Sequence, residues 1–153
     1  MIPYDKKRVL IRFFIFALLG LNLEVFFTSI SGFVLNGNYN LRGHTSLWMV
    51  LDYGLLGVLT PIIKNFLVRR NINLFGRAFV YMLGIYIVEY FSGILFHKVI
   101  GLKIWDYSSL PLNIHGQITF LYAPFWYMLG LGVEKLYEWV DRFALLFCEE
   151  KVD

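Results

Sequence analysis

The length of its apolar runs most constrains what this chain can fold into. Four mainly apolar runs follow one another along the sequence: 9–35, 45–66, 74–100 and 117–139. About 20 apolar residues in a helix cross a hydrocarbon core of roughly 30 Å. Soluble domains are about 45–50% apolar and about 25% charged, whereas this chain is 58% hydrophobic and only 16% charged. The sequence therefore predicts an all-α membrane protein with four transmembrane helices in one domain, residues 1–153.

The distribution of lysine and arginine predicts an orientation. The N-terminal tail, the 68–73 loop and the end of the fourth run are basic, and the other two loops carry few positive charges. Because basic loops stay in the cytoplasm, we expect both termini and the 68–73 loop inside, and the Trp105–Gly116 loop outside. These topology signals account for the net charge of +3. No basic face or binding motif indicates nucleic acid.

The two halves of the sequence resemble each other. Glu24 follows Arg12 by 12 residues, and Glu89 follows Arg77 by the same distance. Each half then continues with a matching set of asparagine, glycine, aromatic residue and glycine: Asn40, Gly43, Tyr53 and Gly57 in the first, Asn113, Gly116, Trp126 and Gly130 in the second. The pattern predicts two parallel helical-hairpin repeats, 9–66 and 74–139. Such repeats are related by a pseudo-twofold axis along the membrane normal.

The second repeat is eight residues longer than the first between its glutamate and its asparagine. The extra residues include Trp105, Asp106 and Tyr107, within the polar loop that interrupts the second half of the chain. Since an insertion in one repeat breaks the symmetry as a functional loop would, we expect this loop to cap a binding site. The alternative is an aromatic membrane anchor with an aspartate-initiated turn.

The repeated glutamates are the main site candidates. A carboxylate inside the bilayer costs roughly 2.5–3.5 kcal/mol, so it faces protein or water. We expect Glu24 and Glu89 to share one polar site between the repeats. They would act there as cation or proton ligands, as a general acid/base pair, or as protonated acids that join helices. Thr28, which lies one turn from Glu24, is expected to donate to its carboxylate.

Further binding candidates come from the second run and the long loop: Asp52, Trp105, Asp106, Tyr107, Asn113 and His115. Asp52 either joins the glutamates or pairs with a basic or amide side chain. The histidines near the same boundary, with Asp106, suggest a metal site, but no His-x-x-x-His or similar spacing supports one. The sequence therefore predicts no metal and no cofactor, and it identifies no catalytic residue.

Two expectations concern the fourth run. Pro124 lies within it and removes a backbone donor, which would free the carbonyl of Phe120. Glu134 and Asp141, at its end, are expected on a solvated face, paired with Lys135 and Arg142.

Several short motifs together resemble a known family. They are Trp105-Asp106-Tyr107-Ser108, Asn113-x-x-Gly116 and Tyr122-x-Pro124-x-Trp126. Over residues 10–140 the chain resembles the ABC-transporter permease type IV family of bacterial membrane proteins and the related animal transmembrane protein 229 family. The resemblance implies a polytopic α-helical protein of the bacterial inner membrane or of the plasma membrane. The chain has no Walker A lysine motif, so it lacks that route to ATP hydrolysis.

Three classes of function fit these observations. The first is a transporter-like or permease-like protein that binds or moves a small solute or ion between the repeats. The second is a non-catalytic scaffold or accessory subunit, and the third is a membrane-embedded enzyme acting on a lipid or isoprenoid. Because four spans are few for a transporter that acts alone, we expect a homodimer or a partner subunit in the lipid bilayer.

Overall fold

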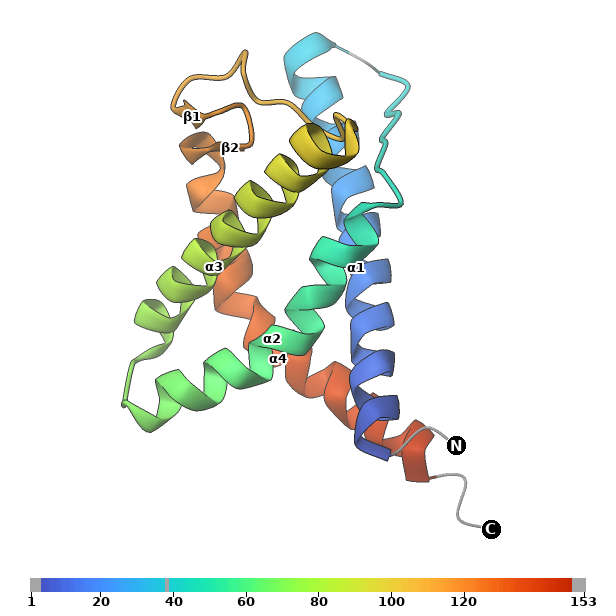
Figure 1. Ribbon diagram of the computed structural model, residues 1–153, viewed down its shortest axis with the longest axis vertical. Helices are drawn as coiled ribbons and strands as arrows, with labels where there is room; N and C mark the ends of the chain where they lie inside the picture. The colour runs from blue at the N-terminus through green and yellow to red at the C-terminus, as the bar shows by residue number, and fades with distance from the viewer. Residues whose placement is uncertain (1–3, 38, 150–153) are drawn as a thin grey trace. The chain divides into compact units, whose positions relative to one another are not determined.

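We describe a computed structural model of the protein, which covers residues 4–37 and 39–149. Its long elements in these ranges are α1 (Tyr4–Asn36), α2 (Met49–Arg69), α3 (Leu74–Ile94) and α4 (Ala123–Glu149) (Figure 1). A π-helical turn, η1 (Leu95–Ile100), extends α3. A short antiparallel pair and a 3₁₀ turn precede α4: β1 (Asn113–Ile114), β2 (Ile118–Thr119) and η2 (Phe120–Tyr122).

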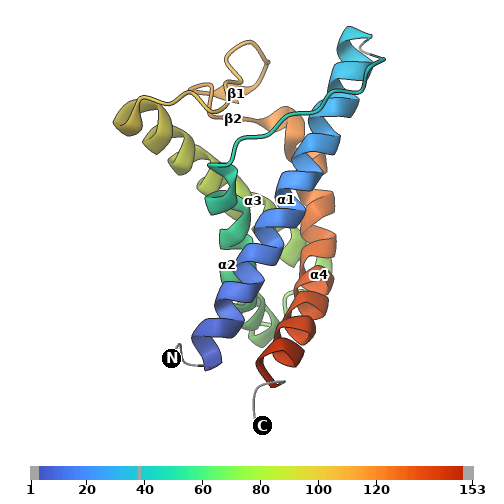
Figure 2. The same cartoon turned by 90° about the vertical axis from the view of Figure 1, so that its right-hand side faces the viewer.

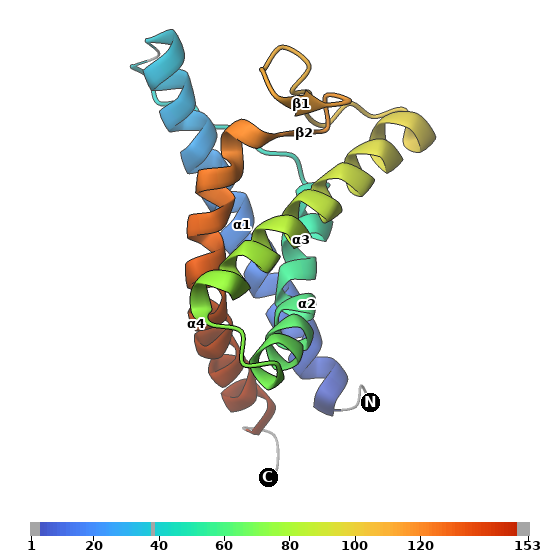
Figure 3. The same cartoon turned by 90° about the vertical axis from the view of Figure 1, so that its left-hand side faces the viewer.

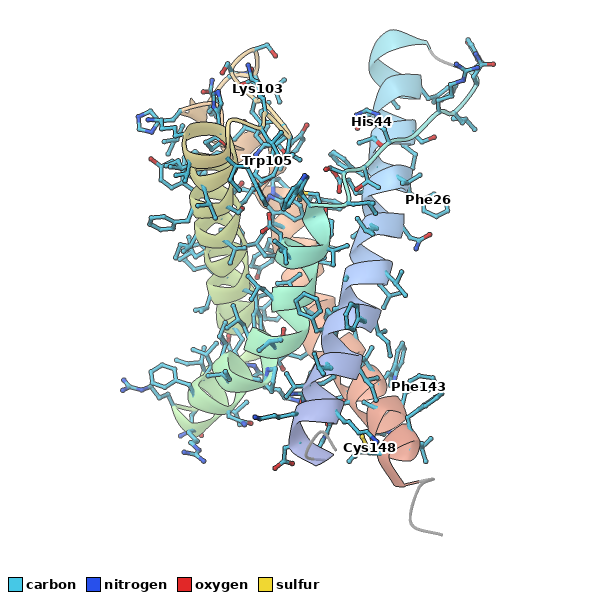
Figure 4. All side chains as sticks on the ribbon, turned by 45° about the vertical axis from the view of Figure 1, so that its right-hand side comes forward. Phe26, His44, Lys103, Trp105, Phe143 and Cys148 are labelled. Carbon is cyan, nitrogen blue, oxygen red and sulfur yellow. The ribbon has the colours of Figure 1, made fainter. Side chains whose placement is uncertain are left out.

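Among the described residues, three helical segments are long and apolar enough to cross a membrane: Asp5–Val34, Met49–Arg69 and Leu74–Ile100. Their surfaces are also apolar. Leu18 is 61% exposed and Phe26 is 68% exposed, and Phe26 projects away from α1 in Figure 4. Large apolar side chains exposed along a whole helix are costly in water and ordinary in lipid. The prediction of a helical integral membrane protein is confirmed.

α4 differs from the predicted fourth span. Residues 117–122 form β2 and η2 rather than the start of a helix, and α4 continues past 139 to Glu149. Its second half is charged, so it does not share the composition of the three apolar segments. Pro124 lies in the first turn, where a helix has no acceptor for the missing N–H. The expectation of a freed Phe120 carbonyl is wrong, because the N–H of Ala123 donates to it.

α2 also begins and ends later than predicted. Residues 45–48 are not α-helical, and the helix starts at Met49. It continues through Pro61 to Arg69, whereas the predicted run ended at residue 66. A proline inside a helix leaves the carbonyl four residues earlier without its usual donor, here that of Gly57. The later start leaves Thr45 in an extended segment, where its side chain becomes available to α1.

The chain divides into two compact units, Met1–Leu59 with Tyr137–Asp153, and Thr60–Leu136. In the first unit, the segment after α1 runs back along that helix (Figure 2). Ser29 Oγ donates to the carbonyl of Leu41 (2.6 Å). Thr28 Oγ1 donates to the carbonyl of His44 and accepts from its N–H, both at 2.9 Å. Side-chain bonds of this kind satisfy the extended backbone that leads into α2.

In the second unit, the polar loop folds back at the C-terminal end of α3 (Figure 3). β1 and β2 close it, with Asn113 opposite Thr119. Thr119 is fully buried, and its hydroxyl donates to the carbonyl of Pro111 (2.8 Å). Tyr86, on α3, donates to the carbonyl of Thr119 (3.1 Å). The loop is therefore an ordered part of this unit, bonded both internally and to α3.

One glycine in each unit allows two helices to approach closely. A Cβ atom on Gly57 would lie 2.7 Å from the carbonyl oxygen of Arg12, and one on Gly130 would lie 2.6 Å from that of Ala78. Small residues permit such backbone contact between membrane helices. Gly57 and Gly130 hold equivalent positions in the two predicted repeats, so each unit packs its own hairpin in the same way.

This close approach predicts opposite effects for two neighbouring substitutions on α4. Gly130→Ala places a methyl group against the backbone of α3, which must shift. We expect it to lower the free energy of unfolding by about 1–3 kcal/mol. At Gly132 nothing lies within 4 Å, so Gly132→Ala should be neutral or stabilising by up to about 1 kcal/mol. Thermal unfolding of the detergent-purified variants measures both effects, and a Gly130→Ala protein as stable as Gly132→Ala would contradict this packing.

Candidate functional site

Glu24, on α1, is held by two hydroxyl groups of the first unit. Thr45 Oγ1 donates to its Oε2 at 2.6 Å, and the Tyr53 hydroxyl donates to the same oxygen at 2.9 Å. Thr45 belongs to the extended segment and Tyr53 to the start of α2. Among the described residues, no lysine or arginine forms an ion pair with Glu24. Its hydrogen bonds therefore satisfy the carboxylate without neutralising its charge.

Glu89 has the corresponding place in the second unit. It is 9% exposed, and the hydroxyl of Tyr107 donates to its Oε1 at 3.0 Å. Tyr107 comes from the inserted loop, as Thr45 comes from the shorter connection in the first unit. The ring of Tyr122 meets that of Tyr107 edge to face, with centroids 5.4 Å apart. Tyr86 lies one turn before Glu89 on α3.

The loop covers one face of α3. The indole N–H of Trp105 donates to the carbonyl of Gln117 (2.9 Å), and its ring meets Phe96 edge to face. Gln117 is 6% exposed and lies against Gly93. The α3 and η1 positions in contact with the loop recur every three or four residues, as one helix face requires: 86, 89, 90, 93 and 96. The loop therefore packs over Glu89, and Figure 4 labels Trp105 and Lys103 on it. Its role as the cap of a binding site stays a prediction.

His115 ties the far side of the loop to the same helix. Its Nδ1 lies 2.8 Å from the hydroxyl of Tyr90. Its backbone φ is +53°, a left-handed conformation that non-glycine residues seldom adopt. Gln117 Nε2 donates to its carbonyl (3.3 Å). Of the loop candidates, Tyr107 contacts Glu89 directly, and Trp105 and His115 fix the loop around it.

Asp106 and Asn113 shape the loop from within. Asp106 Oδ1 accepts from the N–H (2.9 Å) and the hydroxyl (2.5 Å) of Ser108, and Oδ2 lies 2.5 Å from Lys103 Nζ. The hydrogen bond from Lys103, followed by those from Ser108, holds the pKa of Asp106 well below its usual range. Asn113 donates to the carbonyl of Leu110 (2.7 Å) and accepts from the N–H of Gly116 (3.1 Å). These are turn-forming contacts, and a binding role for either residue stays a prediction.

Asp52 lies in the first turn of α2 and is 9% exposed. The positive end of the helix dipole favours a carboxylate there. It belongs to the same unit as Glu24, and its part in binding also stays a prediction.

A buried ion pair in the second unit corrects one expectation. Arg77 donates to Glu134 through both Nε (2.7 Å) and Nη2 (3.0 Å), and the Tyr81 hydroxyl adds a bond of 2.9 Å to the same carboxylate. Glu134 is 6% exposed. The prediction of a solvated Glu134 paired with Lys135 or Arg142 was therefore wrong.

The first unit also contains an arginine–carboxylate cluster, although its acid, Asp141, lies outside both predicted repeats. Arg12 Nη1 donates to Asp141 at 2.8 Å, and Arg8 forms a two-bonded ion pair with the same carboxylate. The helices concerned, α1 and the end of α4, lie side by side in Figure 2. Asp141 was also predicted on a solvated face, and its side chain is 13% exposed. The repeated arginines were the missed signal, because a charge inside an apolar run requires a buried partner.

Three carboxylates on the helices differ in their partners. Glu134 and Asp141 take arginine, whereas Glu24 takes hydroxyl groups of Thr45 and Tyr53. Thr28 was expected to donate to the Glu24 side chain and donates to its backbone carbonyl instead (2.9 Å). Thr45, Tyr53 and Tyr122 were not among the predicted site residues. The aromatic position shared by Tyr53 and Trp126, and the motif that contains Tyr122, were the signals in the sequence that pointed to these rings.

Comparison with known proteins identifies the family. No solved structure matches the chain. A family model described as "Putative ABC-transporter type IV" matches residues 11–151. The match includes both arginines and both glutamates of the predicted repeats, as well as the loop above α3. The resemblance to the permease family is thus confirmed, and the chain belongs to the family described as putative ABC-transporter type IV.

Proposed function

We propose that this protein is a transporter-like membrane protein that binds and moves a small cation at Glu24 and Glu89. One observation carries the proposal. The carboxylate of Glu24 lies on a membrane-crossing helix, and the groups bonded to it are neutral hydroxyls. Glu134 and Asp141, by contrast, are neutralised by arginine. A charge that the fold orients without neutralising is suited to exchange protons and cations.

The physical cost of such a group supports a functional role. Ionisable residues within membrane segments are expensive and usually belong to ion or proton pathways. Either a proton or a bound cation removes the charge, so the two compete for the same oxygen atoms. The Thr45 and Tyr53 hydroxyls can remain bonded to Glu24 in both states, because a hydroxyl both donates and accepts. This arrangement supports exchange of a proton for a cation.

The loop above α3 supplies control of access in this proposal. Tyr107 is the group that joins the loop to Glu89. Rotation of its side chain away from Oε1 would expose the carboxylate, while the bonds of Trp105 and His115 hold the rest of the loop in place. The first unit has no comparable insertion, so the two glutamates would be reached by different routes.

We also propose that α4 is the fourth span and that 9–66 and 74–139 are repeats of one hairpin. The hydroxyl donors and the close glycine contacts recur in each unit by itself, which supports a duplication. α4 is less apolar than the other spans, but its charges Glu134 and Asp141 are paired with arginine and so can lie close to the membrane. A second copy or a partner subunit would complete the bundle, with both termini in the cytoplasm.

The proposed orientation predicts opposite accessibility for two loops. In a Cys148→Ser background, Ser109→Cys should react with a membrane-impermeant maleimide in intact cells. Asn71→Cys should react only after the membrane is broken, because basic loops stay inside. Both residues are exposed, so burial would not explain a difference in labelling between them. Labelling of both positions from the same side would overturn the proposed topology.

The proposed function predicts proton movement in proteoliposomes loaded with a pH-sensitive dye. Pulses of sodium, potassium, choline and tetramethylammonium chloride are added in turn. The wild-type protein should move protons in response to at least one salt. Glu24→Gln and Glu89→Gln should reduce the response to that of empty liposomes, since glutamine keeps an acceptor oxygen but cannot exchange a proton or bear a charge.

The control is Asp5→Asn, which removes an exposed carboxylate from the same helix as Glu24 and should respond like the wild type. All variants must fold, which thermal unfolding checks. If both glutamine variants behave like the wild-type protein, the carboxylates are structural and the chain is better described as a scaffold.

A further inference from the structure

We infer that the Glu89 site takes a small organic ammonium ion that also carries a hydrogen-bond acceptor, and that the indole N–H of Trp126 binds this acceptor. The inference rests on the proposed function and adds the chemical class of the solute. Three observations carry it. They are the aromatic rings near Glu89, the Trp126 nitrogen that lacks a hydrogen-bond partner among the described residues, and the residue at the matching position of the first unit.

Aromatic side chains lie beside the carboxylate of Glu89. Tyr107 donates to it, Tyr122 lies edge to face with Tyr107, and Tyr86 lies one turn before Glu89 on α3. Aromatic faces attract organic cations, and cages of such rings recognise quaternary ammonium groups. A single buried carboxylate supplies the opposite charge. This combination of one anion and several rings is the chemistry that an ammonium ion requires.

An inorganic cation would need a different set of ligands. Divalent and alkali ions are bound by several oxygen atoms, and transition metals by clusters of His, Cys, Asp and Glu. Within residues 4–37 and 39–149, no three such side chains lie together as a metal site would require. The donor bonded to the Glu89 carboxylate is the phenol group of Tyr107, and further rings lie beside it, which favours an organic cation.

Trp126 would add a hydrogen-bond donor, its indole N–H, to the Glu89 site. It packs against the buried cluster of Met82, Tyr86 and Ile118 on the same side as Tyr90. Its Nε1 atom is buried and has no hydrogen-bond partner among the described residues. Buried polar atoms are nearly always bonded, so an exception calls for an explanation. An indole N–H is a donor only, and its missing partner must therefore be an acceptor.

In the first unit, the side chain at the position that matches Trp126 forms a hydrogen bond. Tyr53 holds the place in the first repeat that Trp126 holds in the second, and the Tyr53 hydroxyl donates to Glu24. Trp126 also lies four residues after Tyr122, which places the two on one face of the chain as it enters α4. Trp126 also packs against the cluster that contains Tyr86, which lies one turn before Glu89 on α3, and by this correspondence its nitrogen would face the Glu89 site. An acceptor on a bound solute would complete it.

Equilibrium binding to the full-length protein in nanodiscs tests the inference with two probes of equal charge. Choline carries a quaternary ammonium group and a hydroxyl oxygen, and tetramethylammonium lacks the oxygen. We expect choline to bind about three- to tenfold more tightly, the usual value of one hydrogen bond. Trp126→Phe keeps an aromatic ring and removes the N–H. It should lower the affinity for choline to that for tetramethylammonium, and it should leave the affinity for tetramethylammonium unchanged.

Trp139→Phe is the matched control, because Trp139 lies on the same helix and is 60% exposed; it should bind both probes like the wild-type protein. Tyr122→Leu should lower the affinity for both probes, since it removes an aromatic ring. Equal wild-type affinities for the two probes, or a Trp126→Phe variant that still prefers choline, would overturn the inference.

The outcomes separate this inference from the proposed function. If sodium or potassium drives proton movement that depends on Glu24 and Glu89, but neither organic cation binds, the solute class is wrong and the function stands. If no salt produces movement and none of the ions binds, both are wrong.

Discussion

The cost of placing a carboxylate in a membrane is the constraint on which the rest of the structure depends. A bilayer offers no water to bond such a group, so each one must find its partners in the protein. The chain meets this requirement in two ways. Glu134 and Asp141 are matched with arginines on α3 and α1, whereas Glu24 is matched with hydroxyl groups that leave its charge intact. The first arrangement holds helices together, and the second leaves a group that can react to ions.

The asymmetry between the two units follows from the inserted loop. In the first unit a short extended segment brings Thr45 to Glu24. In the second, the loop is long enough to fold on itself through β1 and β2 and to bring Tyr107 to Glu89. The extra length allows Trp105 and His115 to bond the loop to the rest of the unit. Glu89 is therefore covered by an ordered cap, and its surroundings are richer in aromatic rings than those of Glu24.

Much of this could be predicted from the sequence. The apolar runs predicted the helices, because length and composition alone decide whether a segment can cross a bilayer. The repeated spacing identified Glu24, Glu89 and the loop. The pairing of Arg77 with Glu134 was missed because the two lie 57 residues apart. Apolar periodicity carries no information on which helices touch. The helical content of 117–122 was also overestimated, since an apolar segment that forms a strand and a 3₁₀ turn has the same composition as a helix.

Reaction with a hydrophobic carbodiimide, followed by peptide mass spectrometry, tests the central distinction between the two kinds of carboxylate. This reagent enters membranes and modifies carboxyl groups that carry a proton. An ionised carboxylate held by arginine should not react. We expect modification of Glu24 and Glu89, reduced by the cation that the protein binds, with Glu134 and Asp141 unmodified in the same sample. Modification of Glu134 and Asp141 to the same extent, or no reaction at Glu24 and Glu89, would contradict the account.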